Sequence, residues 1–185
     1  AELLLDHGAD VNTNGAVRWA CTPLMIATEK SATRTMAMLL ERGASLCVDH
    51  CKYSKQAEHV IKRASNSSVE AIALLMKHGA DINQRYNYGQ TLVHTTAGKI
   101  RRSQVPAAAD ATPFTKESLE TFENLERLGA DLLARNGAGE TCAHIVANNG
   151  IPDVAAALVN HDLRLATATT KGGHTPFSAA CGKSA

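Results

Sequence analysis

The chain has 185 residues, of which 44% are hydrophobic and only 4% aromatic, and its 19 basic and 18 acidic side chains give a formal net charge of +1. This balance provides no general attraction to nucleic acid or to an anionic membrane surface, so we expect neither as a partner. No run of 18 apolar residues occurs, and we therefore expect no membrane insertion.

Short helices with one apolar face recur along the chain, and each ends at the same phrase. The phrase is Gly-Ala-Asp at residues 8–10, 79–81 and 129–131, and Gly-Ala-Ser at 43–45. Its glycine is expected to adopt positive φ and so to end the helix. Positions −7, −4 and −3 before the glycine are mostly apolar, as in Met36, Leu39 and Leu40, which predicts a buried helix face. The first glycines lie 35 and 36 residues apart, a period typical of arrays of repeated units.

A second phrase keeps register with the first. It reads Thr-Pro-Leu-Met at 22–25, Thr-Leu-Val-His at 91–94, Thr-Cys-Ala-His at 141–144 and Thr-Pro-Phe-Ser at 175–178. The threonine is a candidate N-cap, and Pro23 and Pro176 suit the first helical position, where no amide donor is needed. Together the phrases resemble the ankyrin repeat, whose signature is Thr-Pro-Leu-His-x-Ala before a helix ending in Leu-Leu-x-x-Gly-Ala-Asp. Residues 55–59 depart most from this pattern.

The resemblance covers nearly the whole chain and implies an all-α, ankyrin-type solenoid of helix-turn-helix repeats with inter-repeat hairpin loops. Such an array has no single deep cleft, so we expect function on the surface that the stacked units present. Because the chain opens within a second helix and stops soon after Thr175, we expect it to belong to a longer chain or a larger complex. We predict one array of about five repeats: 1–19 (partial), 20–52, 53–88, 89–138, 139–172 and 173–185 (partial).

The fourth repeat contains an insertion near 99–114. Thr91 and Thr141 are 50 residues apart, whereas Thr141 and Thr175 are 34 apart. Prolines and an alanine run predict an exposed loop there, and the phrase at 112–114 is expected to cap the second helix. A solvated insertion is the favoured interpretation, since long loops cost little. A regulatory element is the alternative, because basic residues precede Ser103 in a plausible phosphorylation context.

The Trp and Tyr residues all fall in the inter-repeat loops. In the proteins that this chain resembles, those loops project as finger tips beside a concave binding surface, and Trp and Tyr are enriched at binding hot spots. The alternative is that these rings pack against neighbouring fingers or helix ends. The predicted partner-binding residues are these aromatics with two arginines as polar support: Trp19, Tyr53, Tyr86, Tyr88, Arg18 and Arg85.

The sequence contains only weak signals of a metal site. The one metal-like cluster, Cys47, His50, Cys51 and His59, matches no standard zinc spacing, so no metal or cofactor is expected. The five scattered cysteines and the lack of a visible signal peptide favour reduced thiols in an intracellular protein, cytoplasmic or nuclear.

Catalysis is not expected either. Cys142 and His144 are two residues apart on a presumed helix and therefore point in different directions. His94 and His144 occupy the histidine place of the repeat phrase, for which the resemblance implies structural hydrogen bonds between repeats. We therefore predict a protein–protein interaction or scaffold module, not an enzyme, that binds a protein partner through its concave face and finger loops. A structural subunit of a large assembly and a regulatory segment of a larger enzyme or channel remain open alternatives.

Overall fold

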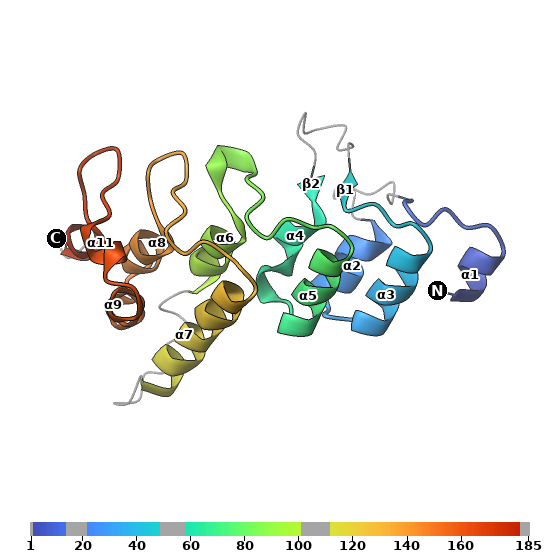
Figure 1. Cartoon of the computed structure of the whole chain (residues 1–185), viewed down its shortest axis with the longest axis horizontal. Coiled ribbons are helices and arrows are strands. Elements are labelled where there is room, and N and C mark those ends of the chain that lie inside the picture. Colours follow the sequence, from blue (N-terminus) through green and yellow to red (C-terminus); the bar gives the residue numbers. More distant parts are fainter. Residues whose placement is uncertain (1, 14–21, 49–57, 101–111, 182–185) are drawn as a thin grey trace. The chain divides into compact units, whose positions relative to one another are not determined.

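The computed structural model of the chain describes residues 2–13, 22–48, 58–100 and 112–181. The chain divides into two compact units, Ala1–Tyr86 and Asn87–Ala185, each of which is described by itself. Both are built from short helices joined by loops (Figure 1).

Unit 1 stacks helices in two rows. Helix α2 packs against α3 and α4, and α3 packs against α5. The strands β1 and β2 lie between α3 and α4 in the sequence and pair antiparallel, with Cys47 opposite His59, as a hairpin loop requires. The elements are α1 (Glu2–Asp6), α2 (Pro23–Glu29), α3 (Thr33–Glu41), β1 (Cys47–Val48), β2 (Glu58–His59), α4 (Val60–Arg63), the 3₁₀ turn η1 (Ala64–Asn66) and α5 (Val69–Lys77).

Unit 2 repeats this arrangement. The first helices α6, α8 and α11 pack in one row, and the second helices α7 and α9 pack against each other beside them. In Figure 1 the loops that precede the first helices rise on the side away from α7 and α9. The elements are the 3₁₀ turn η2 (Asn87–Gly89), α6 (Leu92–Lys99), α7 (Thr112–Arg127), α8 (Cys142–Asn148), α9 (Pro152–His161), α10 (Arg164–Thr167) and α11 (Pro176–Cys181).

The helix starts and stops predicted from the two phrases are confirmed. The hydroxyl of Thr22 accepts a hydrogen bond from the amide of Met25 at 3.3 Å, which caps α2. At the other end of a repeat, Gly43 adopts φ +83° and the next amide, that of Ala44, donates to Leu39 at 2.9 Å. The predicted buried face is also present: Met36, Leu39 and Leu40 are all buried. The helical, ankyrin-type fold class is therefore confirmed.

The second helix of the fourth repeat begins where the sequence predicts, since α7 starts at Thr112. It has 16 residues, against 10 in α9. Residues 101–111, which hold most of the predicted insertion, lie outside the described part of the chain, so its loop character stays a prediction. The division into repeats also stays a prediction. No helix among the described residues is both long and apolar enough to cross a membrane.

Candidate functional site

Three loops of unit 2, here called the finger loops, stand side by side (Figure 1). They comprise residues 87–90, 135–140 and 169–174 and are called the first, second and third finger loop. The amide of Gly137 donates to the carbonyl of Tyr88 at 2.6 Å, and the amide of Lys171 donates to the carbonyl of Ala138 at 2.9 Å. Tyr88 and Ala138 each lie three residues before a repeat threonine, so the loops are joined in the same register.

The second finger loop is stiffened by its own polar side chains. The Oδ1 atom of Asn136 accepts from the amides of Ala138 and Glu140, both at 2.9 Å, and its Nδ2 donates to the carboxylate of Glu140 at 2.9 Å. The other carboxylate oxygen of Glu140 accepts from Asn148 at 3.1 Å, which ties the loop to α8. These contacts fix the loop backbone through side chains of unit 2 itself.

The finger loops approach one another so closely that two positions require glycine. A Cβ atom at Gly137 would lie 2.8 Å from the carbonyl oxygen of Tyr88. A Cβ atom at Gly139, which has φ +83°, would lie 2.8 Å from the amide nitrogen of Lys171. Real Cβ atoms are not found so close to backbone, so a larger residue would push the loops apart.

Tyr88 combines exposure with an unusual backbone. Its side chain is 85% exposed, and its φ and ψ are 60° and 25°, in the left-handed region that bulky residues rarely adopt. This conformation costs on the order of 1–3 kcal/mol and persists because surrounding contacts hold it, here the hydrogen bond from Gly137. The equivalent positions in the second and third finger loops are Ala138 and Gly172, so Tyr88 alone of the three carries a large side chain.

The other predicted contact residues are only partly described. Tyr86 is half-buried in unit 1, where the ammonium of Lys62 lies 5.9 Å from its ring centroid. This favours a packing role for part of the ring. Arg85 is exposed. Trp19, Arg18 and Tyr53 lie outside the described residues, and the partner-binding role of all six residues stays a prediction.

His94 and His144 act as structural links, as the resemblance implied. The amide of Thr91 donates to Nδ1 of His94 at 3.1 Å, so Nδ1 is the acceptor and Nε2 carries the proton. Nε2 then donates to the carbonyl of Glu140 at 3.0 Å. His144 repeats this pattern with Thr141, at 3.2 Å, and with the carbonyl of His174, at 2.9 Å. Burial lowers the pKa of His144 below its ordinary value.

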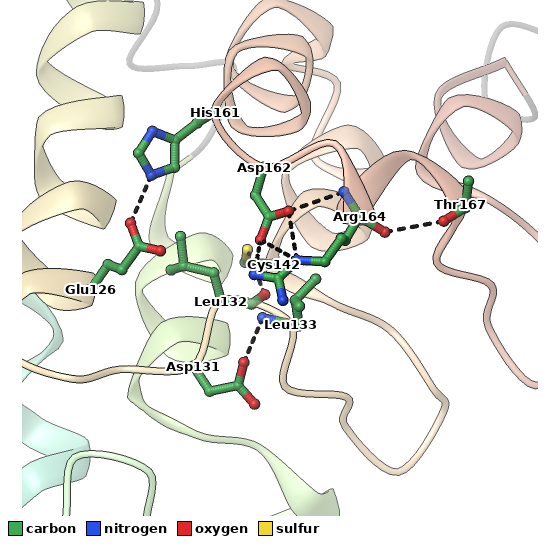
Figure 2. A network of polar contacts seen from close by, with 9 residues as sticks. All are labelled: Glu126, Asp131, Leu132, Leu133, Cys142, His161, Asp162, Arg164 and Thr167. Atoms are coloured by element: carbon green, nitrogen blue, oxygen red, sulfur yellow. Dashed lines mark hydrogen bonds and ion pairs between the residues drawn. The ribbon is translucent and has the colours of Figure 1, made fainter.

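The Cys142 thiol does not form a nucleophile with His144. It is buried, and its Sγ atom donates to the carbonyl of Leu132 at 3.4 Å (Figure 2). Burial raises the pKa of Cys142 to about 12, so the reactive thiolate is disfavoured. Both ring nitrogens of His144 are already engaged. The prediction that these two residues make no catalytic pair therefore agrees with their geometry.

A polar network links the second helices of unit 2 (Figure 2). His161, at the end of α9, contacts the carboxylate of Glu126 on α7 at 2.7 Å. That hydrogen bond is the main cause that raises the pKa of His161. Next to it, the carboxylate of Asp162 accepts from the backbone amide and the guanidinium of Arg164, at 3.0 and 2.8 Å. These hydrogen bonds lower the pKa of Asp162.

Metal binding finds no support in the described part of the chain, where no three His, Cys, Asp or Glu side chains gather to hold an ion. Only part of the metal-like cluster lies within the described residues. Cys47 is a described thiol, whereas His50 and Cys51 lie outside the described residues.

Comparison with known proteins found no matching family model. The chain is 30% identical to mouse ankyrin repeat and SOCS box protein 11 over 152 residues, which cover 82% of this chain and 42% of that protein. It is 28% identical to the mouse B-cell lymphoma 3 protein homolog over 116 residues, or 60% of this chain and 25% of that protein. An ankyrin repeat protein of fowlpox virus, FPV031, is 24% identical over 176 residues, with coverages of 93% and 46%. The chain thus spans less than half the length of each relative.

Proposed function

Since the chain belongs to the ankyrin-repeat proteins, we propose that it binds a protein partner through its finger loops and the adjoining concave face. Ankyrin-repeat proteins serve in general as protein-interaction modules. The chain would then be a non-catalytic binding or scaffold segment of an intracellular protein. Its partner surface would be presented by rigid loops.

Tyr88 carries this proposal. A bulky residue in the left-handed region lowers the stability of the fold, yet here it exposes 85% of its side chain instead of packing it. Backbone strain of this kind concentrates at functional positions. An exposed tyrosine is also the residue type that supplies large contact area for little loss of side-chain entropy.

The hydrogen bonds that order the finger loops would favour tight binding of a partner protein. The carbonyl of Tyr88 is held by Gly137, and the second finger loop is braced by Asn136 and Glu140. Loops that are already ordered lose little entropy when a partner binds. A partner that contacts the ring of Tyr88 would therefore lose little of its binding free energy to ordering the loop backbone.

Site-specific photo-crosslinking tests the proposal. The photoreactive amino acid p-benzoylphenylalanine is placed at position 88 of the full protein in its native extract. As a matched control it is placed at exposed Thr121 on α7, on the other side of unit 2. We expect position 88 to cross-link to one protein in a saturable manner, and we expect position 121 not to cross-link to that protein. Cross-links to several proteins from both positions would instead favour a structural subunit of a large assembly.

Two substitutions then separate binding from stability. Tyr88→Ala should weaken the complex with the cross-linked protein about thirtyfold, the effect of losing a hot-spot side chain worth about 2 kcal/mol. Tyr88→Gly should weaken it similarly while raising the free energy of unfolding by about 1 kcal/mol, because glycine adopts this backbone without strain. Unchanged affinity in both variants would contradict the proposal, and a large loss of stability in Tyr88→Ala would assign the ring to packing.

A further inference from the structure

The second finger loop contains an Asn-Gly step, Asn136-Gly137. Asparagine is a labile residue, and it deamidates most readily before glycine, which has no Cβ atom to hinder attack by its backbone nitrogen. Asn136 is half-buried and Gly137 is exposed, so the step is open to water. The sequence has two more Asn-Gly steps, which begin at Asn14, outside the described residues, and at Asn149, directly after α8.

Deamidation makes two demands on this loop. The backbone nitrogen of Gly137 loses its proton and bonds to Cγ of Asn136, and the bond from Cγ to Nδ2 breaks. The departing nitrogen takes up a proton and leaves as ammonia, and water then opens the cyclic imide to aspartate or isoaspartate. The glycine amide must therefore be free to lose its proton, and the asparagine side chain must be free to turn.

The folded chain opposes both demands. The amide of Gly137 donates to the carbonyl of Tyr88 in the first finger loop at 2.6 Å, so its proton is held there. The side chain of Asn136 is fixed at both ends, because Oδ1 accepts from the amides of Ala138 and Glu140 and Nδ2 donates to the carboxylate of Glu140, each at 2.9 Å. The reaction therefore requires that the second finger loop first separates from Tyr88.

The step at Asn149 is held by different contacts. The amide of Gly150 donates to the carbonyl of Ala147 in its own helix at 3.0 Å. Nδ2 of Asn149 donates to the carbonyls of Ala97 and Ile100 at 3.1 and 2.8 Å. None of these acceptors belongs to a finger loop, so opening of the loops leaves these hydrogen bonds in place. Asn149 is therefore an internal control for general unfolding.

The product of deamidation does not fit the closed loop. Nδ2 of Asn136 lies 2.9 Å from an oxygen of the Glu140 carboxylate, and deamidation replaces this donor with a second carboxylate. Like charges so close together repel. Isoaspartate also inserts one more carbon into the backbone directly before Gly137, whose amide must reach the carbonyl of Tyr88.

We propose that Asn136 is a deamidation site controlled by the contact between the first and second finger loops. The reaction occurs when that contact opens, and the carboxylate formed beside Glu140 prevents the contact from re-forming. The second finger loop thus changes irreversibly from an ordered to an open state. This is independent of the proposed function, because it concerns the covalent state of the loop and not what the loop binds.

Two substitutions at Tyr88 test the control by the loop contact, because they change its backbone and leave the Asn-Gly step intact. The purified protein is incubated at neutral pH, and peptide mass spectrometry follows deamidation at Asn136 and Asn149. Glycine adopts the φ of 60° without strain, so Tyr88→Gly should populate the open loop less and slow the reaction at Asn136 about fivefold. Proline, with φ fixed at about −65°, should accelerate it by at least about fivefold.

The rate at Asn149 decides between loop opening and general unfolding. It should change less than about twofold in Tyr88→Gly, which the contact at Gly137 alone affects. Equal rates at Asn136 in the parent and in Tyr88→Gly would overturn control by the loop contact. Equal slowing at both asparagines in Tyr88→Gly would overturn it too, by assigning the protection to global stability.

Hydrogen exchange of the Gly137 amide tests the effect of the product. Asn136→Asp should raise its exchange rate about fivefold, because the new carboxylate repels that of Glu140. Adding Glu140→Gln should restore slow exchange, since the glutamine amide can donate to the aspartate while its oxygen still accepts from Asn148. Slow exchange in Asn136→Asp alone, or no rescue by Glu140→Gln, would refute the repulsion as the cause of an open loop.

Discussion

The imidazole of His94 joins its own helix to the loop of the following repeat, because its Nε2–H donates to the carbonyl oxygen of Glu140 at 3.0 Å. The ring is buried, and its Nδ1 atom accepts from the amide of Thr91 at the start of α6. One neutral side chain thus caps a helix and couples two neighbouring repeats of unit 2.

Replacing His94 should therefore cost more than replacing an exposed histidine. His94→Ala removes both hydrogen bonds and leaves a cavity, and we expect the free energy of unfolding to fall by about 2–3 kcal/mol in urea denaturation. His78→Ala, at an exposed position after α5, should change it by less than about 0.5 kcal/mol. Equal losses from the two variants would refute the linking role of His94.

The contact between His161 and Glu126 predicts that part of the stability depends on pH. The pKa of His161 is raised, so the folded state binds more protons than the unfolded state above the ordinary pKa of about 6.5. Its contribution is present below that pH and is lost as the pH rises through the raised pKa. The facing carboxylates of Glu123, Glu126 and Asp162 all act in this direction.

The measurement compares the chain with His161→Ala by urea denaturation at about pH 5.5 and about pH 8.5. The difference in free energy of unfolding should be larger at the lower pH, though below about 1 kcal/mol because the pair lies at the surface. The contribution of His144 to stability depends on pH in the opposite sense. Its pKa is lowered by burial, so its contribution is lost as the pH falls below about 6.5. A His161→Ala difference that is constant with pH would contradict the assignment.

The close approach of the finger loops predicts opposite effects for two glycine substitutions. Gly137→Ala places a methyl group 2.8 Å from the carbonyl of Tyr88 and should lower the free energy of unfolding by about 1–3 kcal/mol. Gly98→Ala, inside α6, meets no atom within 4 Å and should raise it by up to about 1 kcal/mol through helix propensity. Thermal unfolding of both variants and of the parent chain measures whether the two substitutions shift stability in opposite directions. A Gly137→Ala variant as stable as the parent would show that the loops do not touch in solution.

Substitutions at Ser31 in unit 1 separate the effect of backbone strain on stability from the effect of a hydrogen bond. It has φ +51° between α2 and α3, and its hydroxyl accepts from the amide of Ser68 at 2.9 Å. Ser31→Ala loses the hydrogen bond and keeps the strain, so we expect a loss of about 1–2 kcal/mol. Ser31→Gly loses the same bond but relieves the strain, and it should be more stable than Ser31→Ala by about 1 kcal/mol. The reverse order in urea denaturation would refute the strain argument.

Helix ends and buried faces were predictable because they follow from local rules. Thr22 caps the helix that starts beside it, and Gly43 ends the helix directly before it, so no distant residue is needed. The role of His94 and His144 followed only from the resemblance, since their partners Glu140 and His174 belong to the next repeat.

The backbone of Tyr88 could not be predicted in this way. Its left-handed conformation depends on a hydrogen bond from Gly137 in the next finger loop, which no local pattern around residue 88 encodes. The same holds for Asn149 in the turn after α8. Its side-chain Nδ2 donates to the carbonyls of Ala97 and Ile100, at 3.1 and 2.8 Å, and so holds the end of α6. Contacts between repeats decide both features.

The close approach at Gly137 and Gly139 restricts how this surface can be redesigned. The finger loops pack directly against one another at these two glycines. A larger residue at either position would therefore displace the neighbouring loop. New specificity would have to come from the three equivalent tip positions, Tyr88, Ala138 and Gly172, which are all exposed. A combinatorial library aimed at new partners should vary these three positions and leave the two approach glycines untouched.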